Sequence, residues 1–257
     1  MPLLVLAGLF FLTAIAYAAV GFGGGSTYNA LLILSGMDYR LIPAIALSCN
    51  ILVVSGGVYH YWHAGVLSIG KLLPFIVLSL PMAWLGGSLP VSEQVFICLL
   101  GFSLLIAAGQ MLLKPDKSAI VEPRLTARYW LIAAPVGGAI GLLAGITGIG
   151  GGIFLAPVLY FLHLVPARTV AGITSGFILI NSVAGLAGQM MKVSEYSPLQ
   201  GWLQAWPLFL AVLIGGQIGS RLGAYHLPET WVKRLTAVLM SYVALRLIWR
   251  WVGMTFQ

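Results

Sequence analysis

The sequence predicts an all-α integral membrane protein with about eight transmembrane helices in two repeated halves. Hydrophobic residues make up 60% of the 257 residues and charged residues 7%, whereas soluble domains carry about 25% charged residues. In addition, an apolar stretch breaks twice on a glycine run of the same shape, at Gly21–Gly25 and at Gly148–Gly152. The offset between the two runs is close to half the chain. We therefore expect each half to begin with a glycine-broken helix.

Spans of roughly 20 residues divide the apolar segments into eight. The first and the fifth span each continue, after the glycine run, into a shorter arm. The predicted spans and arms are 2–20 with 26–35, 41–60, 72–89, 94–113, 130–147 with 152–163, 169–191, 201–220 and 232–250. Residues 2–20 end in Ala-Tyr-Ala-Ala but have no basic leader, and their counterpart before Gly148 is internal. A retained span is therefore expected rather than a cleaved signal peptide.

Shifting the sequence so that Gly21 falls on Gly148 superposes the two glycine runs and places Ser48 on Ser175. This correspondence predicts a first transmembrane repeat over 1–113 and a second over 129–257. Between them, 114–128 is the only long polar stretch of the chain and is typical of an exposed linker. Lys and Arg are more frequent on the side of this linker, so the positive-inside rule places the linker and both termini in the cytoplasm.

The distribution of charge argues against a nucleic-acid partner and against an enzyme. The net charge is +7, but the basic residues occur singly at span ends and form no stripe that could follow phosphates. The acids and histidines also fall in loops or at span ends, so no catalytic group and no metal-ligand set converges. These residues are Asp38, Glu93, Asp116, Glu122, Glu195, Glu229, His60, His63, His163 and His226. No cofactor, no metal and no carboxylate proton relay inside the membrane is predicted.

The glycine breaks are the candidate binding site. Glycine-interrupted segments at matching positions of two halves indicate the substrate site of a transporter. A glycine run that opens a short helix leaves unpaired N–H groups at the positive end of that helix, which suits an anion. Neutral hydroxyl and amide donors lie close by in the sequence. The predicted substrate-binding residues are Gly23, Gly24, Gly25, Ser26, Thr27, Ser48, Asn50, Thr147, Gly150, Gly151, Gly152, Thr174, Ser175 and Asn181.

Simpler interpretations exist for the same residues. Glycines in membrane helices often only allow close helix contact, and buried Asn often bonds between helices. Ser and Thr usually bond to the backbone of their own helix. The aromatic group Tyr59–Trp62 is interpreted as an interfacial belt, and Gln189 and Gln217 are expected to face lipid headgroups. Duplication at matching places favours the functional interpretation for the glycines.

The same motifs resemble a known family. The paired Gly-x-Gly-Gly-Gly breaks, the second continuing as GIGGGIFLAPVL to Pro157, resemble the sulfite exporter TauE/SafE family, also called the toluene sulfonate uptake permeases. The Thr174-Ser175 step and the Gly-Gly-x-x-Gly pattern from Gly215 resemble it too, and the likeness spans nearly the whole chain. In the first half, Asn29-Ala30 stands where the family usually has Pro. The resemblance implies an inner-membrane carrier for sulfite, thiosulfate or sulfonates.

We therefore expect a secondary transporter that exports sulfite or a small organosulfonate by alternating access at a midplane site. Its expected partners are a small sulfur oxyanion or sulfonate and the lipid bilayer. A homodimer is a possible assembly. Two other classes remain as alternatives. One is an anion channel or uniport pore that uses the same site, and the other is a membrane assembly subunit that transports nothing. Metal transport is a weaker alternative, because four scattered histidines make a poor ligand set.

Overall fold

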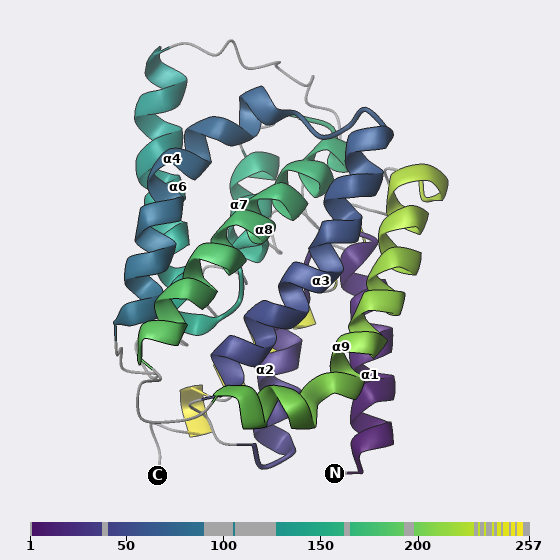
Figure 1. Ribbon diagram of the computed structural model, residues 1–257. Helices are drawn as coiled ribbons and strands as arrows, with labels where there is room; N and C mark the ends of the chain where they lie inside the picture. The colour runs from purple at the N-terminus through teal and green to yellow at the C-terminus, as the bar shows by residue number, and fades with distance from the viewer. Residues whose placement is uncertain are drawn as a thin grey trace.

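The computed structural model describes residues 2–37, 41–89, 127–161, 165–192 and 198–228, together with Leu105 and isolated positions between 231 and 253. Within these residues all regular structure is helical, and Figure 1 shows a bundle of helices. The helices are α1 (Leu3–Ala18), α2 (Gly25–Leu34), α3 (Ile42–His63), α4 (Ile69–Ser88), α6 (Ala127–Thr147), α7 (Gly152–Phe161), α8 (Ala167–Lys192) and α9 (Pro198–Arg221). A π-helical turn, Leu222–His226, follows α9.

Five of the described helices are long and apolar enough to cross a membrane. These candidate spans are Ile42–His63, Ile69–Ser88, Tyr129–Thr147, Ala167–Met191 and Ala205–His226. The apolar helix α1 is shorter, with 16 residues. Apart from Leu105, the predicted span 94–113 lies outside the described residues, as do about half of the residues of 232–250 and the predicted linker up to residue 126. The count of eight spans and the division into two repeats therefore stay predictions.

Both predicted helix breaks are present. The first break separates α1 from α2 over residues 19–24, and the second separates α6 from α7 over residues 148–151. The backbone turns through positive φ at Gly21 and Gly24, with φ of 80° and 90°, and at Gly148, Gly150 and Gly151, with φ between 71° and 82°. Side chains clash with their own backbone in this region, so glycine is required there.

The long helices pack crosswise between the predicted halves. The helix α4 lies along α6 and α8, and α9 lies along α1 and α3 (Figure 1). The helices α3 and α8 also pack against each other. Each predicted half thus places one of its later helices in the other half, and the packing groups α1–α3–α9 and α4–α6–α8 combine segments from both. This exchange brings the two breaks together.

Two rows of glycines hold the crosswise pairs in close contact. On α6, Gly137, Gly141 and Gly145 repeat every fourth residue, and a Cβ at each would overlap the backbone of Phe75, Ser79 and Ala83 on α4. On the other side, Gly215, Gly219 and Gly223 meet the carbonyl oxygens of Phe11, Ile15 and Ala19. Contact between helix backbones is the usual role of small residues in membrane helices. At these six positions glycine serves close contact between helices, which is the simpler of the two interpretations.

Candidate functional site

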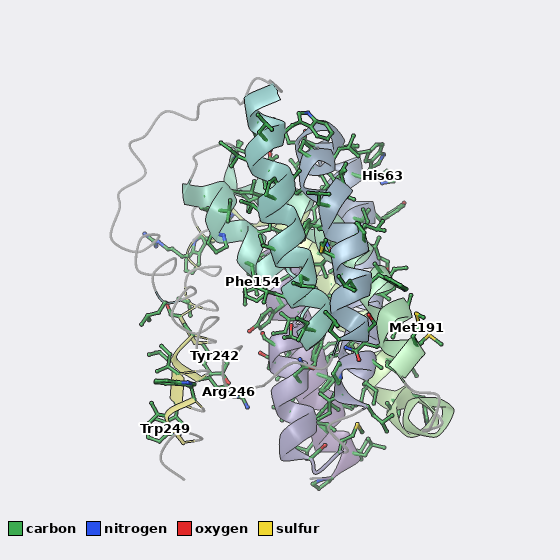
Figure 2. All side chains as sticks on the ribbon, turned by 90° about the vertical axis from the view of Figure 1, so that its left-hand side faces the viewer. His63, Phe154, Met191, Tyr242, Arg246 and Trp249 are labelled. Carbon is green, nitrogen blue, oxygen red and sulfur yellow. The ribbon has the colours of Figure 1, made fainter. Side chains whose placement is uncertain are left out.

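The two breaks meet inside the bundle. A Cβ on Gly25, the first residue of α2, would lie 3.0 Å from the carbonyl oxygen of Gly148. One turn further along α2, Asn29 donates a hydrogen bond from Nδ2 to the carbonyl oxygen of Thr147, with a length of 2.8 Å. Phe154, in the first turn of α7, lies about halfway along the bundle, whereas His63 and Met191 lie toward its periphery (Figure 2). Phe154 follows the second break closely, so this break lies about halfway along the length of the bundle.

Asn50 of α3 lies between the breaks and contacts both. Its side chain is fully buried, and Nδ2 makes a long hydrogen bond of 3.5 Å to the carbonyl oxygen of Gly148. A Cβ on Gly25 would come within 2.6 Å of Nδ2, and a Cβ on Gly150 within 3.0 Å. A Cβ on Gly23 would overlap Oδ1. The absence of side chains at these glycines makes the room that Asn50 occupies.

Helix α8 also passes both breaks. Near its N-terminal end, Ser175 donates from its hydroxyl group to the carbonyl oxygen of Gly21 over 3.1 Å. The Thr174 hydroxyl lies 3.2 Å from the same oxygen, and it lies closer, at 2.8 Å and 3.0 Å, to the carbonyl oxygens of Val170 and Ala171 in its own helix. One and two turns further, Ile178 and Ser182 lie against the second break: a Cβ on Gly150 would be 2.8 Å from Ile178 Cγ2 and 2.9 Å from Ser182 Oγ. Residues spaced by three or four along a helix share a face. One face of α8 therefore connects the two breaks.

At both breaks, carbonyl oxygens receive side-chain donors. Thr174 and Ser175 bond to Gly21, while Asn29 bonds to Thr147 and Asn50 to Gly148. In each case the donor comes from the other predicted half of the chain. These bonds cover the carbonyl oxygens where α1 and α6 end, which carry partial negative charge.

The first N–H groups of the short helices α2 and α7 have no hydrogen-bond partner in their own helix. In α2 the first helical hydrogen bonds come from the N–H groups of Thr27 and Tyr28 to Gly24, and in α7 they come from Phe154 and Leu155 to Gly151. The N–H groups before them in each helix precede the first hydrogen-bonded turn, so they have no partner in their own helix. Partial positive charge thus remains at the breaks while partial negative charge is covered, which suits an anion.

Several buried polar atoms around the breaks have no hydrogen-bond partner. In the described part of the chain, these side-chain atoms are Ser26 Oγ, Tyr28 OH, Asn29 Oδ1, Asn50 Oδ1, Asn181 Oδ1, Ser182 Oγ and, further away, Arg168 Nε. Buried polar groups are nearly always bonded to protein or water. A concentration of free donors and acceptors at one place is therefore expected where a polar ligand binds.

The predicted site residues fall into two groups. Gly23, Gly25 and Gly150 come together around Asn50, and Ser175 and Thr174 lie against the first break at Gly21. Gly24, Gly151 and Gly152 instead lie against Tyr28, Phe177 and Ile178. Three others bond to the backbone of their own helix: Ser48 to Ala44, Thr147 to Leu143 and Asn181 through Nδ2 to Phe177. Thr27 shares a 2.9 Å hydrogen bond with Tyr17, and Ser26 is part-buried. Two residues outside the predicted set, Asn29 and Ser182, also face the breaks.

Two interpretations from the sequence are wrong. Tyr61 is not part of an interfacial belt, because it is fully buried and donates through OH to the carbonyl oxygens of Ala18 and Ala19. Tyr61 lies about three helical turns after Asn50 on α3, so the two share a face of the helix. This spacing is the sequence signal that could have predicted a buried Tyr61. Gln189 does not face headgroups either, since it is buried and bonds through Nε2 to Gly145.

Other expectations for the site stand untested. All six acidic residues lie outside the described part of the chain, so the predicted lack of a carboxylate relay stays a prediction. Within the described residues, no three His, Cys, Asp or Glu side chains gather as a metal site would require. Cys49, next to Asn50, is a buried cysteine outside any disulfide.

The coverage of the first break predicts a loss of stability when its donors are removed. We expect the double variant Thr174→Val, Ser175→Ala to lower the free energy of unfolding in detergent by about 1–3 kcal/mol, because the Gly21 carbonyl is left buried and unpaired. Ser55→Ala is the matched control, since that exposed hydroxyl bonds only to Leu52 of its own helix. Equal unfolding curves for the two proteins would contradict the role given to Thr174 and Ser175.

Comparison with known proteins agrees with a membrane transporter. The family model described as "Sulfite exporter TauE/SafE" matches residues 6–247. A "probable membrane transporter protein" of Sinorhizobium fredii is 36% identical over 245 residues, which cover 95% of this chain and 97% of that protein. Proteins with the same description from Xylella fastidiosa and Methanocaldococcus jannaschii are each 25% identical, over 89% and 88% of this chain and 88% and 89% of their own lengths. No solved structure matches the chain.

Proposed function

This chain belongs to the sulfite exporter TauE/SafE family, and we propose that it is a secondary transporter for a small sulfur-containing anion. The proposed passenger is sulfite or a small organosulfonate, which is carried out of the cell. It binds between the two helix breaks, with the breaks near the middle of the inner membrane and both termini in the cytoplasm. The relatives are described as membrane transporters, and the substrate is our inference from the site.

One observation supports an anion over a cation. Side-chain donors bond to the carbonyl oxygens of Gly21, Thr147 and Gly148, whereas the first N–H groups of α2 and α7 precede any helical hydrogen bond. A cation would need those carbonyl oxygens, and an anion needs the N–H groups. The side chains that hydrogen-bond to the breaks are neutral, so the anion meets dipoles rather than a fixed counter-charge. Weak multipoint attraction of this kind permits release as well as binding.

Alternating access is part of the proposal, and the packing suggests which bodies move. Because α4 packs on α6 and α8, and α9 packs on α1 and α3, each moving body combines helices from both predicted halves. The contact between α3 and α8 is the natural boundary between the bodies. Both helices carry side chains against both breaks, so sliding at this boundary would open the site first to one side and then to the other.

The test is a counterflow assay with purified protein in liposomes. Vesicles loaded with unlabelled sulfite, thiosulfate, sulfate or taurine are diluted into a trace of the labelled anion. We expect saturable accumulation with sulfite or a sulfonate, because a carrier exchanges passengers one at a time. Flux that does not saturate, at rates far above those of a carrier, would instead indicate a channel. Absence of protein-dependent flux for every sulfur anion would refute the proposal and favour an assembly subunit.

A further inference from the structure

We propose that the passenger is a monoanion that also carries one hydrogen-bond donor, with hydrogen sulfite as the simplest sulfur example. The transporter then moves a proton together with its passenger, without a proton relay of its own. This inference rests on the proposed function, because it specifies the ionic form that the site between the breaks accepts. It follows from the buried acceptor that the structure places opposite the free N–H groups.

The acceptor is Oδ1 of Asn50. The Asn50 side chain is fully buried, and Oδ1 has no hydrogen-bond partner. Its amide group cannot simply rotate to present Nδ2 instead, because Nδ2 faces the carbonyl oxygen of Gly148. Exchanging the two atoms would place two acceptor oxygens against each other. An amide oxygen only accepts hydrogen bonds, so it requires a donor from whatever binds beside it.

The opposite requirement comes from the helix ends. The N–H groups at the start of α2 and α7 only donate, and they require acceptor oxygens. The start of α2 lies against the Asn50 side chain, because a Cβ on Gly25 would be 2.6 Å from Nδ2 and 3.1 Å from Oδ1. The free donors of α2 and the free acceptor therefore border the same place. An anion with oxygen acceptors on one side and an O–H on the other satisfies both. Sulfate and the sulfite dianion are all acceptor and leave Oδ1 buried and unpaired.

The charge of the surroundings points the same way. The side chains that hydrogen-bond to the breaks, Asn29, Asn50, Thr174 and Ser175, are neutral. Helix termini supply roughly half an elementary charge each, so the two N-termini of α2 and α7 balance about one negative charge. A second negative charge would find no counter-charge among these four side chains, and burying it is costly in a medium of low polarity.

The protein's own titratable groups leave the pH profile to the passenger. Around the first break the described titratable side chains include Tyr17, Tyr28, Cys49 and Tyr61, and Arg246 acts on Tyr17 electrostatically. Phenols and thiols ordinarily hold their protons near neutral pH, and arginine keeps its charge. His60 lies almost three helical turns along α3 from Asn50, which is about 15 Å in a helix. On the side of the second break, the described residues that contact Asn50 are Gly148 and Gly150, and neither carries a titratable side chain.

A flux assay at varied pH tests the inference. Total sulfite outside the proteoliposomes is adjusted at each pH so that hydrogen sulfite stays constant while the dianion rises about tenfold per pH unit. We expect a constant initial rate after subtraction of protein-free vesicles, and acidification of an alkaline lumen as the passenger releases its proton. A rate that rises with the dianion would overturn the inference and leave the proposed function intact. No protein-dependent flux of any sulfur anion would overturn both.

A matched pair of ligands tests the donor directly. Ethanesulfonate and 2-hydroxyethanesulfonate are both permanent monoanions and differ by one hydroxyl group. We expect the hydroxylated anion to compete with labelled sulfite roughly tenfold better, because it pairs the buried Oδ1 of Asn50. Asn50→Leu should abolish this difference, whereas Ser55→Ala on the same helix should retain it. Equal competition in the wild-type protein would overturn the inference even if Asn50→Leu fails to fold.

Discussion

Gly150→Ala is expected to abolish transport while the protein remains folded. Gly150 has φ of 82°, and its new Cβ would lie 2.8 Å from Ile178 Cγ2, 2.9 Å from Ser182 Oγ and 3.0 Å from Asn50 Nδ2. The methyl group would therefore enter the space where the breaks meet and displace two buried polar side chains. At about 1–3 kcal/mol for each displaced group, initial flux should fall by about 100-fold. Counterflow in liposomes measures it.

Gly65→Ala is the matched control for this variant. Gly65 also has positive φ, at 69°, but a Cβ there meets nothing within 4 Å. Both substitutions cost backbone strain of about 1–3 kcal/mol, and Gly150→Ala should lose further stability through the displaced side chains. Only Gly150→Ala should lose flux. Equal transport by the two variants would mean that the second break serves helix geometry alone.

Gly145→Leu is expected to prevent folding. Gly145 is on α6, where a Cβ would overlap the carbonyl oxygen of Ala83 and lie 2.7 Å from the backbone nitrogen of Gly87 on α4. Backbone atoms cannot move aside as the end of a side chain can, so α4 and α6 would have to separate along their length. Overpacking usually costs about 1–3 kcal/mol and more where the backbone must move. Loss of the monodisperse peak in detergent chromatography is the expected result.

Gly8→Leu on α1 is the control for the same change in size. A Cβ at Gly8 meets nothing within 4 Å, so added apolar atoms would face open space. We expect this variant to fold and transport as the wild-type protein does. A folded Gly145→Leu protein with normal yield would contradict the close contact between α4 and α6, and with it the crosswise packing on which the central site depends.

The sequence alone determined the features that depend on local backbone physics and on composition. A chain with 7% charged residues is predicted to lie in the bilayer, and five of the described helices are long and apolar enough to cross it. Both breaks were predicted from their glycines, because positive φ at positions such as Gly24 and Gly151 is nearly closed to other residues. The family was also recognisable from these motifs, and its model matches residues 6–247.

Partners of individual side chains were not predictable in the same way. Ser48 and Ser175 correspond when the two glycine runs are superposed, yet Ser48 bonds to its own helix while Ser175 reaches Gly21. Tyr59 and Tyr61 belong to one aromatic group, yet Tyr59 is 58% exposed and Tyr61 is fully buried. Local sequence cannot distinguish the members of such pairs, because both have similar neighbours along the chain.

Only the tertiary structure decided which residues meet. The packing of α3 against α8, and of α4 and α9 against helices of the other predicted half, sets which face of each helix turns toward the breaks. Asn50 reaches both glycine runs for this reason, and Ser182 joins it from α8. The physical cause is that a helix fixes the spacing of its side chains, whereas its rotation and its neighbour are set by packing over the whole bundle.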